Sequence, residues 1–159
     1  MCEIKKIKAA EMFGVVKELL SQGTKAWITV TGMSMYPFLR EDRDRVELAQ
    51  GSFGSIKKGD IVLIKRVSGE YVLHRVLRKE KEVFYMIGDA QKWIEGPLLP
   101  EQLIAVVTSI KRGKHEISCN NLWWKALTGF WLRIIPFRHI ALRGIHRLTG
   151  IRRIVRKPA

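Results

Sequence analysis

Cysteine is scarce in this chain, which has only Cys2 and Cys119 among its 159 residues. Two cysteines exclude a disulfide-rich scaffold and most structural zinc sites. Long apolar runs are missing too. The longest stretch without a charged residue runs from Ala26 to Leu39, which is shorter than the roughly 20 apolar residues of a membrane-spanning helix. The N-terminal segment carries Glu3 and Glu11 and has no long apolar core, which argues against a secretory signal.

Acidic residues are absent after residue 119, although the chain carries 15 of them. Nine of the 29 lysines and arginines lie in that same segment, together with three of the five tryptophans. The formal net charge is +14, and such an excess favours an acidic partner, either nucleic acid or an anionic membrane surface. We therefore expect three parts: an N-terminal helix in residues 1–25, a β domain in residues 26–119 and a basic amphipathic helical tail in residues 120–159.

The hydrophobic pattern predicts a mainly β fold. Helical spacing in the first part is limited to Ala9–Leu20, where Phe13 and Val16 share a face and Gly23 follows as a stop. Six later runs rich in β-branched residues are separated by Gly, Lys, Glu or Pro. They are Trp27–Thr31, Arg45–Leu48, Asp60–Lys65, Tyr71–Leu77, Val83–Ile87 and Leu103–Ile110. Short strands with short connections predict a coiled, partly closed β-sheet rather than βαβ units.

A serine lies between a glycine and a proline in the segment Gly32-Met-Ser-Met-Tyr-Pro. Gly32 permits a left-handed backbone and Pro37 fixes the exit from the turn, so the turn can expose the Oγ of Ser34. Serine is also a common turn residue with no chemical role. Its hydroxyl becomes a good nucleophile only when a neighbouring base takes its proton.

The candidate base is His74, the one histidine of four that lies in a predicted strand of the β domain. Strand alternation puts Val72, His74 and Val76 on one face. An imidazole between two valines is either a buried core histidine or a base held in a partly dry cleft. Lys65, in the preceding predicted strand, is an alternative base for a serine–lysine dyad.

Four short boxes in order resemble the signal peptidase I superfamily, which shares its catalytic fold with the self-cleaving repressors of the SOS type. The match is to the serine–histidine branch found in archaea, the endoplasmic reticulum and spore-forming bacteria. The resemblance covers about residues 26–110. The boxes are Ser34-Met-Tyr-Pro, Lys58-Gly-Asp-Ile-Val, His74-Arg-Val and Gly88-Asp-Ala.

This resemblance implies a serine endopeptidase that removes a leader or signal segment from a precursor peptide or protein. It implies that Ser34 attacks the peptide carbonyl and that His74 is the general base. The acid partner of the histidine would be Asp89 or Glu95, since the second acidic residue usual after Gly-Asp is replaced here by a more distant glutamate. No metal or cofactor is expected.

The resemblance also implies a shallow apolar cleft in which the substrate lies as an added β-strand. Met33, Met35 and Tyr36 are expected to line it. Most signal peptidases have an N-terminal membrane anchor, which this sequence does not show. A self-cleaving repressor would need a DNA-binding module, and the residues before Trp27 are expected to form only one helix.

The composition of the basic tail predicts binding to a membrane surface. A helix is expected from Trp123 to Arg133, and Pro136 can start a second one. An apolar face with tryptophans, rimmed by arginines, is typical of helices that lie in the plane of a membrane surface. We therefore expect peripheral association with the cytoplasmic membrane, through residues 120–159. Packing on the β domain or on a partner is one alternative. Nucleic-acid binding is another, but the β domain lacks a recognisable binding signature.

Overall fold

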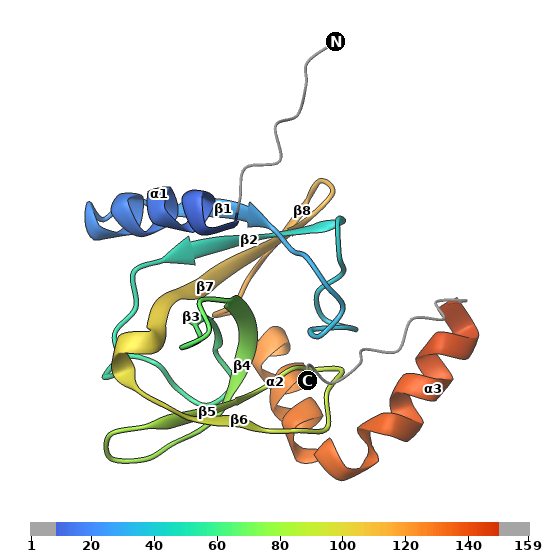
Figure 1. Ribbon diagram of the computed structural model, residues 1–159. Helices are drawn as coiled ribbons and strands as arrows, with labels where there is room; N and C mark the ends of the chain where they lie inside the picture. The colour runs from blue at the N-terminus through green and yellow to red at the C-terminus, as the bar shows by residue number, and fades with distance from the viewer. Residues whose placement is uncertain (1–8, 150–159) are drawn as a thin grey trace.

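The computed structural model describes residues 9–149, which form one antiparallel sheet of eight strands flanked by helices (Figure 1). The helices are α1 (Ala9–Ser21), α2 (Leu122–Arg133) and α3 (Arg138–Thr149), with short 3₁₀ turns at Pro100–Gln102 and Ile135–Phe137. The strands are β1 (Ala26–Thr29), β2 (Asp44–Ala49), β3 (Ile61–Lys65), β4 (Tyr71–Lys79), β5 (Phe84–Ile87), β6 (Glu95–Leu98), β7 (Leu103–Arg112) and β8 (His115–Ser118). The mainly β fold class is confirmed.

The strand order is β1-β2-β7-β3-β4-β5-β6, with β8 paired to β7, so the sheet is coiled but not closed. All six predicted strands are present. β6 and β8 were not predicted, because β6 contains a glycine and a proline and β8 is short and polar, and both compositions are depleted in strands.

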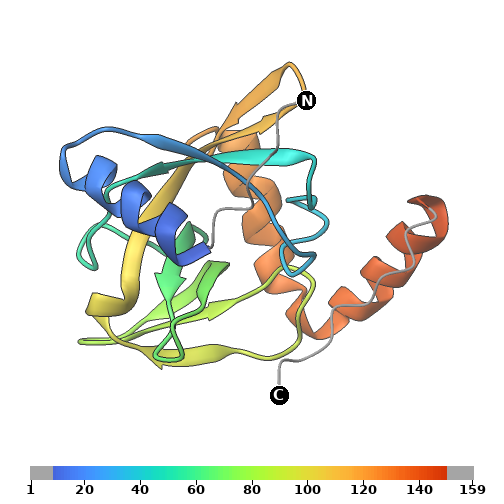
Figure 2. The ribbon, with the colours of Figure 1, turned by 45° about the horizontal axis from the view of Figure 1, so that its top comes forward.

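Two apolar clusters hold the coiled sheet together. Ile61 and Leu63 of β3 belong to the cluster that also buries α1, whereas Val62 and Ile64 belong to the cluster around Phe84. β3 is therefore buried on both faces, because the sheet curls around it. Figures 1 and 2 show α1 on the side of β1 and β2, and α3 extending away on the other side.

The tail forms helices where the sequence predicted them, α2 from Leu122 and α3 soon after Pro136. Trp131 and Leu132 of α2 are buried against the β domain, so this helix is a packed part of the molecule. Every helix within residues 9–149 is too short or too polar to cross a membrane. Val155 and the last four basic residues of the expected amphipathic tail lie outside the described residues.

Candidate active site

A cleft of about 580 Å³ contains both predicted catalytic residues. α1 contributes Met12 and Phe13 to its lining, β1 and the following turn contribute residues 28–32, and β4 contributes residues 71–74. Ser34, Arg66 and Gln91 complete the polar part of the lining. The fold thus brings Ser34 and His74, which are 40 positions apart in the sequence, into one concave site.

The nucleophile candidate is held by its main chain. Gly32 has a φ of 78°, in the left-handed region that favours glycine, and this conformation turns the chain sharply after β1. The carbonyl of Ser34 accepts a hydrogen bond from the N–H of Ala90 at 2.8 Å. A Cβ at Gly88 would lie 2.7 Å from the Ser34 carbonyl oxygen, so only glycine fits there. The Gly88–Ala90 turn therefore fixes the position of the Ser34 main chain in the cleft.

The general-base candidate is oriented by Glu95 rather than by Asp89. His74 is almost fully buried in β4, and its Nδ1 lies 3.1 Å from Oε2 of Glu95, the first residue of β6. Both Nε and Nη2 of Arg66 donate to the same carboxylate, Nη2 at 3.0 Å. Arg66, Glu95 and His74 form a continuous chain of hydrogen bonds that ends at the imidazole.

The carboxylate of Glu95 is ionised at neutral pH. Burial raises its pKa, but hydrogen bonds from His74 and Arg66 outweigh burial and lower the pKa to about 2. In the neutral imidazole, an ionised carboxylate favours the tautomer with the proton on Nδ1, in which Nε2 is the nitrogen without a proton. A neutral imidazole in this tautomer has the form of a general base.

Ser34 and His74 share the cleft without being bonded to one another. Within residues 9–149, the hydroxyl of Ser34 makes no hydrogen bond to the His74 ring. The serine is half-buried, and rotation about its Cα–Cβ bond can change the direction of Oγ. Catalytic hydrogen bonds are often loose before substrate binds and tighten in the complex.

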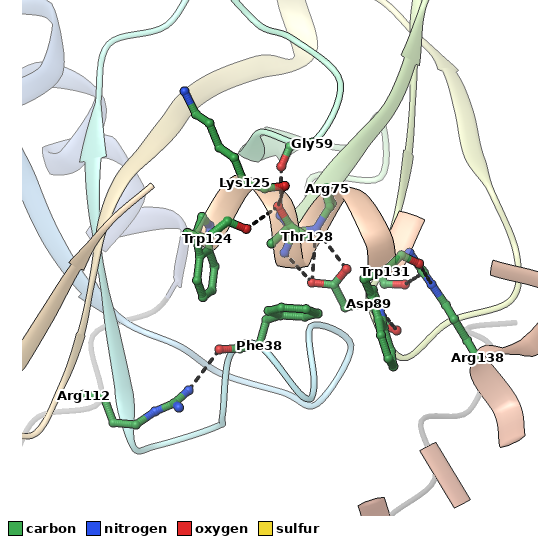
Figure 3. A network of polar contacts seen from close by, with 11 residues as sticks. Phe38, Gly59, Arg75, Asp89, Arg112, Trp124, Lys125, Thr128, Trp131 and Arg138 are labelled. Carbon is green, nitrogen blue, oxygen red and sulfur yellow. Dashed lines mark hydrogen bonds and ion pairs between the residues drawn. The ribbon is translucent and has the colours of Figure 1, made fainter. Parts of the chain in front are cut away.

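Asp89, the other candidate acid, is paired elsewhere. Its carboxylate accepts bonds from Nε and Nη2 of Arg75 at 2.9 and 2.7 Å, and both side chains have no exposed surface (Figure 3). Nη1 of Arg75 donates to the carbonyl of Gly59 at 2.8 Å. The main-chain oxygen of Asp89 accepts the indole N–H of Trp131. Asp89 thus links the Gly-Asp turn to β4 and α2, and its role is to hold these elements together.

The same network docks α2 on the nucleophile turn. Trp124 and Trp131 of α2 meet the ring of Phe38 edge-on, with centroids at 5.5 and 5.6 Å, and the Arg75 guanidinium lies 5.2 Å from that ring (Figure 3). Phe38 is four residues after Ser34. Two of the three tail tryptophans are therefore used for packing on the β domain, which is the alternative that the tail sequence left open.

Removing the carboxylate of Asp89 should destabilise the protein strongly. Asp89→Ala leaves the guanidinium of Arg75 buried without its partner, and breaking a buried pair in this way costs about 3–5 kcal/mol. The free energy of unfolding in urea measures the loss. Glu80→Ala, which breaks the exposed pair with Arg78, is the matched control and should change stability by less than about 1 kcal/mol. Equal effects of the two variants would contradict this account.

The expected apolar lining is partly wrong. Met35 does line the cleft, but Met33 and Tyr36 line a different cavity, next to α3. The reason is the turn after Gly32, in which the N–H of Tyr36 donates to the carbonyl of Met33 at 3.1 Å; Met33 and Tyr36, three positions apart, face one side, and Ser34 and Met35 face the cleft. Met12 and Phe13 of α1 supply the apolar wall instead, with Phe13 stacked on Tyr71 at 4.2 Å.

The alternative base, Lys65, does not line the cleft. Its side chain is exposed, and its ammonium lies 5.6 Å from the centroid of Tyr71. The next residue, Arg66, has the role in the site that sequence reasoning missed. An arginine at the end of a strand carries no motif that could have revealed it.

The described residues contain no group of three His, Cys, Asp or Glu side chains that could hold a metal ion. No protein-family model matches this chain, and no curated protein is significantly similar to it.

Proposed function

We propose that this protein is a serine endopeptidase that removes a leader or signal segment from a precursor peptide or protein. One observation carries the proposal: Ser34 and His74 line one cleft, and Glu95 holds the Nδ1 side of the imidazole. A serine, a histidine and an orienting carboxylate are the parts of a nucleophilic triad, which is recognised by its geometry and not by its order in the chain. The four sequence boxes support the same reading.

In the proposed mechanism, His74 takes the hydroxyl proton of Ser34 at Nε2 while Oγ attacks the scissile carbonyl. Glu95 stabilises the imidazolium that forms, and the imidazolium then gives its proton to the leaving amine. Water hydrolyses the acyl-enzyme by the same steps. The main-chain N–H of Ser34 donates to no protein group within residues 9–149, so it is available to the oxyanion. Such a donor lowers the barrier by about 3 kcal/mol.

Two free strand edges at the cleft support an extended substrate. β1 is an end strand of the sheet and pairs only with β2 in the described part of the chain. Residues 71–74 of β4 pair with β3, but the pairing of β4 with β5 starts only at Arg75. Both edges belong to segments that line the cleft. A precursor peptide can therefore add as a strand there, with its side chains alternating between cleft and solvent.

The test of this function is a cleavage assay on the full chain with a panel of leader-containing precursor peptides, run with and without anionic vesicles. A fluorophosphonate that labels Ser34, located by peptide mapping, reports the activated hydroxyl independently of substrate choice. Cleavage that is unchanged in Ser34→Ala, or a label found elsewhere, would reject the proposal.

We further propose that the tail helices place the enzyme on an anionic membrane surface. Their outer side carries seven exposed large apolar residues, which are Leu122, Trp123, Leu127, Phe130, Phe137, Ile140 and Leu148. Lys125, Arg133, Arg143 and Arg147 are exposed on the same helices, and residues 120–149 contain no acid. Two contributions stabilise a helix at a membrane surface. Apolar side chains are buried in the lipid interface, and lysine and arginine attract anionic headgroups.

Removing two of these apolar side chains should weaken vesicle binding. Trp123→Ser combined with Phe137→Ser should lower the affinity for phosphatidylglycerol vesicles about tenfold or more, because each ring contributes buried apolar area. Co-sedimentation measures the bound fraction. Val67→Ser is the control, since Val67 is 98% exposed in the turn between β3 and β4, away from both helices. Equal binding of all three chains would contradict the membrane surface.

A further inference from the structure

A second cavity, of about 210 Å³, lies between the nucleophile turn and α3. Five of its ten lining residues are lysine, arginine or histidine, and none is acidic. These five residues come from two segments, Lys92 from the loop after the Gly-Asp turn and Arg138, His139, Arg143 and His146 from α3. The lysine and the two arginines, gathered in a hollow lined by no carboxylate, create a positive potential that attracts anions.

The deepest of these cations has one nitrogen without a partner. Arg138 is 1% exposed; its Nε donates to the carbonyl of Trp131 at 3.1 Å and its Nη1 to the carbonyl of Gly88 at 3.3 Å. Its Nη2 is buried and makes no hydrogen bond within residues 9–149. The carboxylate that acts on it most, Asp89, is already held by Arg75. An unsatisfied buried donor is costly, so an acceptor from outside the chain would stabilise this arrangement.

A second unsatisfied atom belongs to the same cavity. Nδ1 of His146 is buried and has no hydrogen-bond partner among the described residues, while the ring stacks on Tyr36 with centroids 5.2 Å apart. Arg143 and Lys92 are exposed and line the cavity as well. Arginine suits the tetrahedral oxygens of a phosphate group, because its planar guanidinium can donate two parallel bonds.

We propose that this cavity binds a phosphate ester, with Arg138, His146 and Arg143 as donors to the phosphate oxygens. Met33, Tyr36 and Leu142 supply apolar walls for the small organic part of the ester. A phospholipid headgroup and a free phosphate offer the same chemistry. The headgroup is the preferred source, since Phe137 and Ile140 are exposed on the segment that carries Arg138. The burial of Arg138, which lowers its pKa to about 10, is the cost that a bound anion would offset. The site stands independently of the proposed peptidase activity.

The experiment is calorimetric titration of the full chain with inorganic phosphate and with glycerol 3-phosphate, against sodium chloride at the same ionic strength. The pocket variant is Arg143→Gln with His146→Gln, because Arg138 bonds two carbonyls and its loss could disturb the fold. Its affinity should fall about tenfold, which corresponds to the loss of one charge-assisted hydrogen bond. Arg147→Gln removes an exposed charge from the same helix outside the cavity, and its affinity should change less than about twofold.

A parallel experiment with vesicles shows whether the phosphate group belongs to a lipid headgroup or to a free phosphate. If the headgroup is the ligand, the pocket variant also loses about tenfold in affinity for phosphatidylglycerol vesicles, whereas Arg147→Gln does not. If free phosphate is the ligand, only the soluble titrations separate the two variants. Equal weakening by the pocket variant and Arg147→Gln, or no phosphate binding beyond the chloride control in either arm, overturns the proposal. None of these readouts requires cleavage activity, so failure here and failure of the peptidase are distinguishable.

Discussion

Ser34→Ala should reduce precursor cleavage to the background rate, a loss of about 10⁴-fold or more in kcat/KM. The alanine chain has no Oγ to attack the carbonyl, and the oxyanion donor and the substrate contacts that remain supply only residual catalysis. His74→Ala should cost nearly as much, because an unassisted serine hydroxyl is a weak nucleophile. The double variant should be no slower than either single one, since the two residues act as a unit. Initial rates on a leader-containing peptide measure all three.

The fold should survive the first of these changes. The Ser34 hydroxyl makes no hydrogen bond within residues 9–149, and the bond from Ala90 goes to the main-chain carbonyl, which alanine retains. Thermal unfolding of Ser34→Ala should therefore match the wild type. Ser68→Ala, an exposed serine in the turn between β3 and β4, is the matched control and should keep full activity. Cleavage by Ser34→Ala at more than about one hundredth of the wild-type rate would exclude Ser34 as the nucleophile.

The fold class could be predicted because β-branched runs and glycine-rich turns are local signals. The six predicted strands are β-branched runs bounded by such turns. β6 has no β-branched residue, and it becomes a strand by pairing with β5. The role of the tail tryptophans could not be predicted from local sequence. Trp124 and Trp131 are compatible with membrane binding as well as with packing, and only the contacts of α2 with Phe38 show that these two side chains pack on the β domain.

The choice between Asp89 and Glu95 could not be made from sequence for a geometric reason. His74 and Arg75 are successive residues of β4, so their side chains point to opposite faces of the sheet. Both faces are buried here, and each face meets its own acid: Glu95 reaches His74, and Asp89 reaches Arg75. Nothing in the spacing of the two acids shows which face each one reaches. Arg66 was missed for the same reason, since its role depends on the position of β6.

Glu95→Gln should lower kcat/KM by about 10²–10⁴-fold and leave KM nearly unchanged. The glutamine amide can donate to Nδ1 of His74 and so favour the tautomer in which Nε2 carries the proton and cannot act as a base. It also removes the negative charge that stabilises the imidazolium in the transition state. A purely structural role for Glu95 would instead raise KM together with the fall in kcat.

Glu70→Gln is the matched control for this prediction. Glu70 is the other carboxylate on Arg66, at 2.9 Å from Nη1, but it is exposed and makes no contact with His74 among the described residues. Its loss should change kcat/KM less than about threefold, as expected for an exposed ion pair. Arg66→Gln should be intermediate, because it leaves Glu95 on His74 but removes the guanidinium that positions the carboxylate. An effect of Glu70→Gln equal to that of Glu95→Gln would assign the loss to Arg66 rather than to the histidine.

The pKa of Glu95 adds a measurement that does not depend on any substrate. Its pKa is about 2 in the folded chain and 4.5 as the ordinary value, so the unfolded state binds this proton first as the pH falls. The ionised carboxylate therefore stabilises the fold fully above about pH 4.5, and that contribution is lost as the pH falls from there toward 2. Glu95→Gln should be less stable than the wild type at pH 7, with the difference shrinking across this acid range. A difference that stays constant from pH 7 to the acid limit would mean that the bonds from Arg66 and His74 do not depend on the charge of Glu95, and the charge-based role of this residue in the triad would fall with them.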